Sequence, residues 1–422
     1  MFFRTIPDGW EIKKMPQVVK WGSGGTPKAT EKQYYDGGSI PWLVIGDLND
    51  SIVSSSASKI TELGLQNSSA KMIPVGTLLV AMYGSIGKLG ITGIECCTNQ
   101  AIAYAKELYG VTTKYMFFYM AMMKSELISK GKGGTQKNIS QTVLNSLEVI
   151  VPPLPEQERI VARIEELFSQ LDAGVETLKK TKAQLAVYRQ AVLKEAFEGR
   201  LTYHVPLSLS MPWASSDETK NLPTLPKEWR YIALKHLGDL GRGKSKHRPR
   251  NDPKLFIDGK YPFIQTGDVK AATNYITTFT KQYGEFGLSQ SKLWPKGTLC
   301  ITIAANIAET AFLGIDACFP DSVVGFTPSE SVLAEYIRYF VESQKIRLWA
   351  FAPATAQKNI NLDTLENLIV PYCSIDEQRT VISEIESRLS VCDSIEQTVD
   401  AALQQAEAMR QSILKDAFEG RM

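Results

Sequence analysis

The sequence predicts an α+β protein with two tandem mixed α/β domains, separated by two long helices that pair as an antiparallel coiled coil. The first observation behind this prediction is an internal repeat at an offset of about 221 residues. At that offset, 17 of the 48 positions from Leu154 to Leu201 match Ile375 to Met422 without a gap. The second is a seven-residue spacing of apolar residues within both segments. A period this long exceeds that of solenoid repeats, so each unit should be a domain followed by a helix, related by an approximate internal two-fold axis.

The bulk composition is that of an ordinary globular protein. With 422 residues, 44% hydrophobic and 22% charged, the chain has room for two or three domains. Its start holds no apolar run typical of a signal peptide, and the longest apolar stretch, Tyr115 to Met123, is far shorter than the roughly 20 residues of a membrane span. Six cysteines without a CxxC pair and three histidines argue against a zinc site and a disulfide framework. We therefore expect a cytoplasmic protein that binds no metal.

The first domain is expected to cover residues 1–151. Short strands are predicted over Ser39–Ile45, Leu78–Tyr83 and Ala101–Tyr104, because Gly and Asn punctuate these apolar runs, and a helix is predicted over Thr112–Ser129. The prolines at 152, 153 and 155 would not be tolerated inside a helix, so they mark the boundary. Residues 152–201 then read as a first spacer helix that stops at Gly199.

The second half repeats this order after a linker. Residues 202–226 are rich in proline, serine and threonine, which is typical of a connector. Residues 227–371 are the second domain, and a second spacer helix is expected from Asp376 to Phe418 within residues 372–422. The apolar positions spaced by seven form the predicted seam of the coiled coil: Ile164, Leu171, Leu178, Leu185, Val192, Ile385, Cys392, Val399, Ala406 and Ile413. The alternative is that each stripe packs only on its own domain.

Short motifs in the first half resemble those of one known family. They are Gly24-Gly25-Thr26-Pro27, Ile40-Pro41-Trp42, Thr98-Asn99-Gln100-Ala101, Gly134-Thr135-Gln136-Lys137-Asn138-Ile139, and Leu154-Pro155-Glu156-Gln157. In order, spacing and duplication the chain resembles the specificity subunit of type I restriction-modification enzymes. The second domain departs from the pattern, with Phe319-Pro320-Asp321 in place of Thr98-Asn99-Gln100 and Gly243-Lys244-Ser245 in place of Gly24-Gly25-Thr26.

The resemblance implies a non-catalytic subunit with two target-recognition domains. Each domain would read one half of a bipartite, asymmetric target in double-stranded DNA. The helices, at residues 152–201 (the central conserved region) and 372–422 (the C-terminal conserved region), would set the spacing of the two halves and dock two adenine-methyltransferase (modification) subunits. No cofactor is expected on this chain. S-adenosylmethionine would belong to the modification subunits, and ATP and Mg to a restriction subunit that can join them.

One motif points to a different function. Residues from Gly238 to Ser245 match GxxxxGK[ST], the phosphate-binding pattern of nucleotide hydrolases. Such a loop needs a helix after it, but the following residues include Pro249 and Pro253 among clustered charges. A nucleotide-dependent enzyme is therefore the weaker alternative, beside a scaffold that binds proteins through its two domains. We expect no catalytic residues.

The candidate DNA-binding residues are basic or polar side chains in predicted loops, because such groups contact phosphates and base edges. They are Ser23, Thr26, Lys28, Lys88, Lys130, Lys132, Thr135, Gln136, Lys137, Asn138, Arg242, Lys244, Lys246, Arg248, Arg250, Gln357, Lys358 and Asn359. Two alternatives remain. The basic loop from Arg242 to Arg250 can be a solvated surface, and the repeated Gln-Lys-Asn tripeptides can serve only to fix the loop between domain and helix.

Overall fold

The computed structural model describes residues 6–133, 137–202, 211–351 and 359–422. The chain forms two compact units, one of residues 1–179 with 400–422 and the other of residues 180–399. We call them unit 1 and unit 2. Both boundaries fall inside a long helix, so each unit combines one α/β domain with part of each helix.

The domain of unit 1 is built on a five-stranded sheet. Its strands, in spatial order, are β2 (Val19–Ser23), β9 (Ile102–Leu108), β6 (Leu78–Ala81), β7 (Leu89–Thr92) and β4 (Ser51–Val53). Only the pair β4 and β7 is parallel. A smaller sheet has the order β5 (Lys59–Ile60), β3 (Ile40–Leu43) and β8 (Cys97–Thr98), and β1 (Glu11–Lys14) pairs with β10 (Glu148–Val151).

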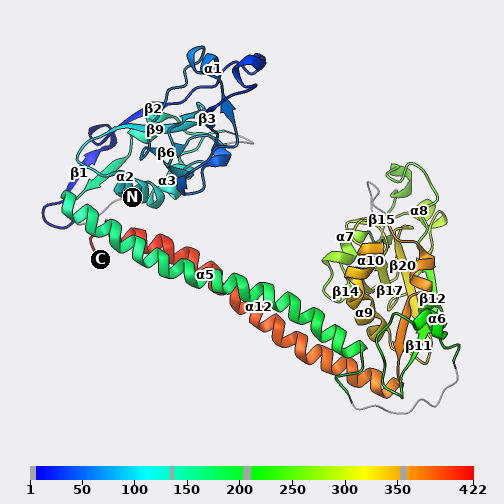
Figure 1. The fold of residues 1–422 in the computed structure, drawn as a ribbon. Helices are drawn as coiled ribbons and strands as arrows, with labels where there is room; N and C mark the ends of the chain where they lie inside the picture. The colour runs from blue at the N-terminus through cyan, green and yellow to red at the C-terminus, as the bar shows by residue number, and fades with distance from the viewer. Residues whose placement is uncertain (1–5, 134–136, 203–210, 352–358) are drawn as a thin grey trace. The chain divides into compact units, whose positions relative to one another are not determined.

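Four short helices accompany these sheets in the described part of unit 1. They are α1 (Glu62–Gln66), α2 (Thr113–Met122), α3 (Lys124–Ser129) and α4 (Gln141–Asn145). The single helix predicted over residues 112–129 is wrong in one respect, because the helix breaks at Met123, whose ψ angle is −1°. The hydroxyl of Thr112 caps the start of α2 by accepting a hydrogen bond from the Tyr115 amide. Figure 1 labels α2 and α3 near the start of α5.

Unit 2 repeats this topology. Its five-stranded sheet has the order β12 (Gly238–Arg242), β20 (Val323–Pro328), β17 (Leu299–Thr302), β18 (Thr310–Leu313) and β14 (Tyr275–Ile276), and again only the last pair is parallel. The second sheet has the order β15 (Lys281–Tyr283), β13 (Tyr261–Phe263), β19 (Ala317–Cys318) and β16 (Leu293–Trp294), and β11 (Arg230–Ala233) pairs with β21 (Ile369–Tyr372).

The remaining elements are short helices and single turns. The short helices of unit 2 are α6 (Ser216–Thr219), α7 (Thr266–Ala271), α8 (Glu285–Ser289), α9 (Ala334–Ser343), α10 (Lys345–Phe351) and α11 (Leu362–Glu366). Single 3₁₀ turns are η1 (Met15–Gln17), η2 (Lys32–Tyr34), η3 (Ile45–Asp47), η4 (Leu234–His236) and η5 (Pro253–Leu255).

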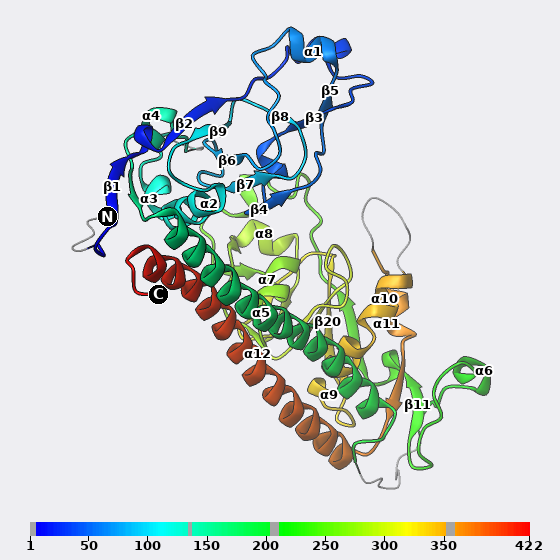
Figure 2. The ribbon, with the colours of Figure 1, turned by 60° about the vertical axis from the view of Figure 1, so that its left-hand side comes forward.

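Two helices of 44 residues, α5 (Leu154–Phe197) and α12 (Ile375–Phe418), correspond to the predicted spacers. Each stops before a glycine, Gly199 or Gly420, whose φ of 70° is the left-handed conformation of a helix C-cap. The helices run antiparallel where they meet. In unit 1 Arg410 pairs with Asp172, whereas in unit 2 Arg189 pairs with Asp393 at 2.7 Å, so numbering rises along α5 as it falls along α12. Figures 1 and 2 both show the end of α12 beside the first half of α5.

The seven-residue seam lies inward along both helices. Its buried members are Ile164, Leu185, Val192, Ile385, Cys392, Val399 and Ala406, and its half-buried members are Leu171, Leu178 and Ile413. The second seam is looser, since Gly174 and Tyr188 on α5, and Ile395 and Met409 on α12, are exposed. The predicted fold class, two mixed α/β domains with paired antiparallel helices and an internal repeat, is confirmed.

A buried glutamine fixes the start of α5 to the domain of unit 1. The side chain of Gln157 has no exposed surface. Its Nε2 donates to the main-chain carbonyls of Gly110 and Pro152 at 2.8 and 2.9 Å, and its Oε1 accepts from the Thr112 amide at 3.0 Å. All three partners are main-chain atoms, which need this polar side chain because they are withdrawn from water.

The same arrangement recurs at the start of α12. Gln378 is also fully buried. It donates to the carbonyls of Ser331 and Cys373 at 3.3 and 3.0 Å, and accepts from the Leu333 amide at 2.9 Å. The repeated Glu-Gln pair is therefore partly explained, because its glutamine joins helix to domain in both halves.

The far end of each helix enters the core of the other half of the chain. Phe418, at the end of α12, is fully buried in unit 1, with its ring edge-on to Tyr115 and Tyr119 at centroid distances of 5.2 and 5.1 Å. The equivalent contact in unit 2 is made by Phe197, Tyr336 and Phe340. The repeated Ala-Phe-Glu-Gly-Arg run is thus an aromatic anchor followed by a glycine cap.

Candidate nucleic-acid interface

The GxxxxGK[ST] match in unit 2 is not a phosphate-binding loop. Gly238–Arg242 is the strand β12, which pairs with β20, and the chain after Ser245 runs to the 3₁₀ turn η5 without an intervening α-helix. A phosphate-binding loop would need free backbone amides and a helix N-terminus at this position.

The two domains share one geometric feature at this point, a close approach between two segments of the backbone. A Cβ on Gly243 would lie 2.2 Å from the Phe319 carbonyl oxygen, and one on Gly24 in unit 1 would lie 2.1 Å from the Thr98 carbonyl oxygen. Gly243 and Gly24 therefore occupy the same place in the two scaffolds. Only glycine fits both, whereas the side chains that follow differ.

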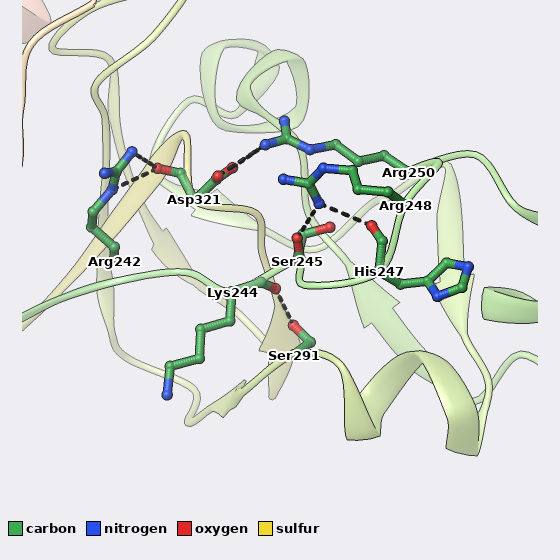
Figure 3. Close-up of polar contacts among 8 residues, drawn as sticks. All are labelled: Arg242, Lys244, Ser245, His247, Arg248, Arg250, Ser291 and Asp321. Atoms are coloured by element: carbon green, nitrogen blue, oxygen red, sulfur yellow. Dashed lines mark hydrogen bonds and ion pairs between the residues drawn. The ribbon is translucent and has the colours of Figure 1, made fainter.

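Two arginines converge on Asp321 beside this glycine (Figure 3). The Nε and Nη2 groups of Arg242 donate to the main-chain carbonyl of Asp321 at 2.9 and 2.7 Å. The Nη2 group of Arg250 donates to both carboxylate oxygens of Asp321, at 2.8 and 2.9 Å. All three residues are exposed or partly exposed, so the cluster is an ordered group of charges at the surface of unit 2.

A shallow hollow of about 220 Å³ adjoins the cluster. Arg242, Arg250, Asp321, Ala304 and Asn359 are among its lining residues. Asn359 forms a β-bridge with Ala304, in the β17–β18 hairpin. The structure thus brings together three residues predicted from distant parts of the sequence: Arg242, Arg250 and Asn359.

The other basic residues of the loop do not join this group. Lys244 is held through its main-chain carbonyl, which accepts from the Ser291 hydroxyl at 2.8 Å, and Figure 3 shows its side chain pointing away from Asp321. Lys246 is exposed and its amide donates to the Gln290 carbonyl at 3.1 Å. Arg248 turns back onto its own loop, where it donates to the carbonyls of Ser245 and His247.

An acidic residue tethers the same loop. His247 contacts the Asp252 carboxylate at 2.7 Å. The hydrogen bond from the Lys254 amide, and next the contact with His247, hold the pKa of Asp252 below its ordinary value. Asp252 therefore stays charged and keeps the basic loop folded on itself.

In unit 1, Lys137 and Asn138 contact the β6–β7 hairpin. The main chain of Asn138 exchanges hydrogen bonds with Lys132, at 2.8 and 3.0 Å, and its side-chain oxygen accepts from the Gly84 amide at 3.2 Å. Asn138 also bridges Tyr83, as Asn359 bridges Ala304 in unit 2. These contacts support the loop-fixing role for the asparagine in the first domain. Thr135, Gln136, Gln357 and Lys358 lie outside the described residues.

Lysines gather around a second hollow in unit 1. Lys88, Lys124 and Lys137 line a depression of about 520 Å³ together with Asp50. Lys124 pairs with Asp50 at 3.0 Å, and the ammonium of Lys88 donates to the Ile45 carbonyl at 3.4 Å. The predicted residues Lys88 and Lys137 are thus neighbours.

The remaining predicted residues of unit 1 are spread over other surfaces. Lys130 pairs with Glu126 at 3.4 Å, and Lys28 pairs with Glu31 at 3.4 Å. Ser23 is exposed at the end of β2. The hydroxyl of Thr26 donates to the Gln100 side chain, which links the Gly-Gly-Thr-Pro and Thr-Asn-Gln motifs.

Neither Asp321 nor Lys124 is among the residues predicted from sequence to bind DNA. Asp321 carried a signal, because it stands 221 residues after Gln100, in a motif where the second domain departs from the first. Lys124 carried none, since only the packing of α3 brings it to the hollow beside Lys88.

The comparison with known protein families gives a match to most of the chain. The model of the type I restriction modification DNA specificity domain matches residues 7–186 and again residues 226–405. The chain belongs to this family. The two matches each take in one α/β domain and part of a long helix, in agreement with the repeat described above.

Individual relatives in the family are distant. The chain is 26% identical over 315 residues to the type I restriction enzyme EcoBI specificity subunit of Escherichia coli, covering 72% of this chain and 65% of that relative. It is 26% identical over 265 residues to the MjaIX specificity subunit of Methanocaldococcus jannaschii, covering 62% of this chain and 58% of that relative. These matches therefore span less than two thirds of those relatives' own length. The EcoKI specificity subunit of E. coli is 21% identical over 99% of this chain and 90% of the relative.

Solved structures share the family's fold. A chain from a study of complex assembly and conformational transition of the type I R-M system has a TM-score of 0.76 and 17% identity, covering 99% of this chain and 100% of that one. The HsdS subunit from Thermoanaerobacter tengcongensis has a TM-score of 0.56 and 16% identity, covering 99% and 98%. At these identities the likeness establishes the fold alone.

The described residues include neither a membrane-spanning helix nor a metal-binding cluster. Within residues 6–133, 137–202, 211–351 and 359–422, none of the helices combines the length and apolar character needed to cross a membrane. In the same ranges, histidine, cysteine and acidic side chains form no group of three suited to a metal ion.

Proposed function

We propose that this protein is the DNA specificity subunit of a type I restriction-modification complex. It catalyses no reaction itself, and each α/β domain reads one half of a split, asymmetric target in double-stranded DNA. The observation that carries this proposal is the repeated scaffold with different polar groups at equivalent loop positions. Where unit 2 has Arg242 and Asp321, unit 1 has Ser23 and Gln100. Two domains with the same scaffold but different polar side chains fit a DNA target whose two halves differ in sequence.

The partners follow from the same proposal. Two modification subunits, which methylate adenine with S-adenosylmethionine, bind the paired helices, and restriction subunits that use ATP and Mg can join them beside the DNA in the cytoplasm. The support is the loose second seam. Tyr188 in unit 2 and Met409 in unit 1 stand at equivalent positions, 46% and 45% exposed. In unit 2, Val391 and Ile395 on α12 are also exposed, at 57% and 40%, whereas the equivalent residues of unit 1 are Gln170 and Gly174. Exposed apolar residues at repeated positions suit two copies of one apolar partner surface.

The direct test is to map N6-methyladenine in cells that express the chain with its modification subunit, and in cells that lack the chain. We expect one split, asymmetric sequence to be methylated only when the chain is present. A symmetric sequence would contradict the reading of different halves. Unchanged methylation, with the partner active and bound, would favour a protein-binding scaffold. Binding to DNA that weakens steeply with salt would separate recognition from the scaffold, because phosphate contacts release counterions.

The docking surface can be tested by Val391→Asp. Because Val391 is exposed, the substitution should change the free energy of unfolding by no more than about 0.5 kcal/mol. It should nevertheless weaken binding of the modification subunit at least tenfold, since a carboxylate would be buried without a partner. Copurification of the modification subunit, with Glu158→Asp on the exposed surface of α5 as control, measures the effect. Undiminished copurification would show that the modification subunit binds a different surface of the chain.

A further inference from the structure

We infer that the Arg242, Asp321 and Arg250 cluster is a guanine-reading subsite of the second domain, in which Arg242 contacts the base. The inference deepens the proposed function and rests on it. It names one base class in one half of the target and one side chain that selects it. The cluster is the described group in unit 2 where two guanidinium groups meet a hollow.

The geometry of Arg242 leaves one donor edge for a base. A guanidinium carries five N–H donors in a planar fork. The edge formed by Nε and Nη2 is engaged by the Asp321 carbonyl at 2.9 and 2.7 Å. The second edge, formed by Nη1 and the other proton of Nη2, matches O6 and N7 of guanine in the major groove. One carbonyl therefore orients the fork without using the edge that would read the base.

Asp321 and Arg250 complete the subsite electrostatically. A lone carboxylate at a DNA surface would repel phosphates, but the Nη2 group of Arg250 contacts both oxygens of Asp321 at 2.8 and 2.9 Å. The charge of Asp321 is thus neutralised within the protein. Arg242 keeps its net positive charge toward the DNA. Because both arginines are held before binding, less side-chain freedom is lost when a base is contacted.

The residues of unit 1 equivalent to Arg242 and Asp321 carry no charge. Gly24 and Gly243 mark it, through their close approach to the Thr98 and Phe319 carbonyls. There Ser23 stands for Arg242, and Gln100, which accepts a hydrogen bond from Thr26, stands for Asp321. The charged cluster is therefore not needed to build the scaffold. It is a feature that one domain has added at a surface loop.

The backbone next to the hollow is strained in unit 2 alone. Ala305 and Ala308, in the β17–β18 hairpin, have φ angles of 62° and 61°. The equivalent residues of unit 1 are Gly84 and Gly87, at 63° and 74°, where such angles carry no steric penalty. Ala304, beside this strained turn, lines the hollow with Arg242. Strain of this kind persists at binding sites, where surrounding contacts enforce it.

Two arginines could bind a DNA phosphate instead of a guanine. Substitution of Arg242 by lysine distinguishes phosphate binding from guanine recognition. Lysine can replace arginine as a charge against phosphate, but it lacks the planar fork that pairs with guanine. Arg242→Lys should therefore preserve most of the affinity for DNA while losing the preference for guanine at one position. A good bidentate pair supplies roughly 5- to 150-fold discrimination between bases.

The experiment uses the full chain in complex with its modification subunit, and duplexes carrying the methylated split sequence. One guanine at a time is replaced by 7-deazaguanine, which lacks the N7 acceptor, and methylation rate at subsaturating DNA is measured. For the wild type we expect a loss of about five- to tenfold at one guanine of one half-site. That dependence should vanish in Arg242→Lys. It should persist in Lys244→Ala, whose side chain points away from the cluster and contributes only general attraction to DNA.

The outcomes separate the inference from the function beneath it. If no split sequence is methylated, both are overturned. If a split sequence is methylated but the wild type tolerates 7-deazaguanine everywhere, or Arg242→Lys stays as sensitive as the wild type, the guanine subsite alone is overturned. Because the wild-type measurement needs no variant, a variant that fails to fold does not remove the test.

Discussion

Replacing Gln157 with alanine is expected to lower the free energy of unfolding of unit 1 by about 3–5 kcal/mol. The substitution leaves the Thr112 amide and the Gly110 and Pro152 carbonyls without a partner in a buried place, and each such group costs about 1–3 kcal/mol. Gln157→Glu should cost at least as much, because a carboxylate cannot donate to the two carbonyls. Urea unfolding and hydrogen exchange at the Thr112 amide measure the change.

Gln170 provides the matched control for this prediction. It lies on the same helix in unit 1, but its side chain is exposed. Gln170→Ala and Gln170→Glu should both stay within about 0.5 kcal/mol of the wild type. If the Gln157 variants are as mild as these, the buried hydrogen bonds do not hold the helix to the domain.

Phe418→Ala, on the other long helix but also within unit 1, is expected to have a comparable effect. Removing a fully buried phenyl ring costs about 3–5 kcal/mol, and here it also removes the two edge-on contacts with Tyr115 and Tyr119. The end of α12 should detach, so limited proteolysis should cut within residues 400–418 at a rate at least tenfold above that of the wild type.

A conservative variant and a surface variant serve as controls for the Phe418→Ala prediction. Phe418→Leu keeps most of the apolar volume and should cost less than about 2 kcal/mol. Leu63→Ala, at a surface position in unit 1, should leave proteolysis of residues 400–418 unchanged. Equal protection of that segment in Phe418→Ala and wild type would show that other contacts anchor the helix.

The repeat was the strongest predictor because it is visible without any structural assumption. Two helices of equal length could be predicted because seven-residue spacing and flanking prolines or glycines act locally. The break at Met123 could not be, since the apolar residues on both sides continue the helical pattern and only the backbone angle at Met123 interrupts it.

The candidate site was harder to predict, for a physical reason. The sequence shows which loops carry basic and polar residues, and it shows that Arg242 and Arg250 lie in the same loop region. It does not show which partner orients them, because Asp321 lies 79 residues from Arg242 and comes beside it only through the pairing of β12 with β20. Likewise, Lys88 and Lys124 line the same hollow only because of how α3 packs in the folded domain.

The sockets for Gln157 and Gln378 consist of main-chain atoms only, and this has an evolutionary consequence. Gly110 and Ser331 offer the same carbonyl, and Thr112 and Leu333 the same amide, although their side chains differ. Mutations in a domain can therefore accumulate without loosening its hold on the helix, provided that the path of the backbone is kept. A lineage could acquire a new recognition domain by recombination and inherit a working joint with it.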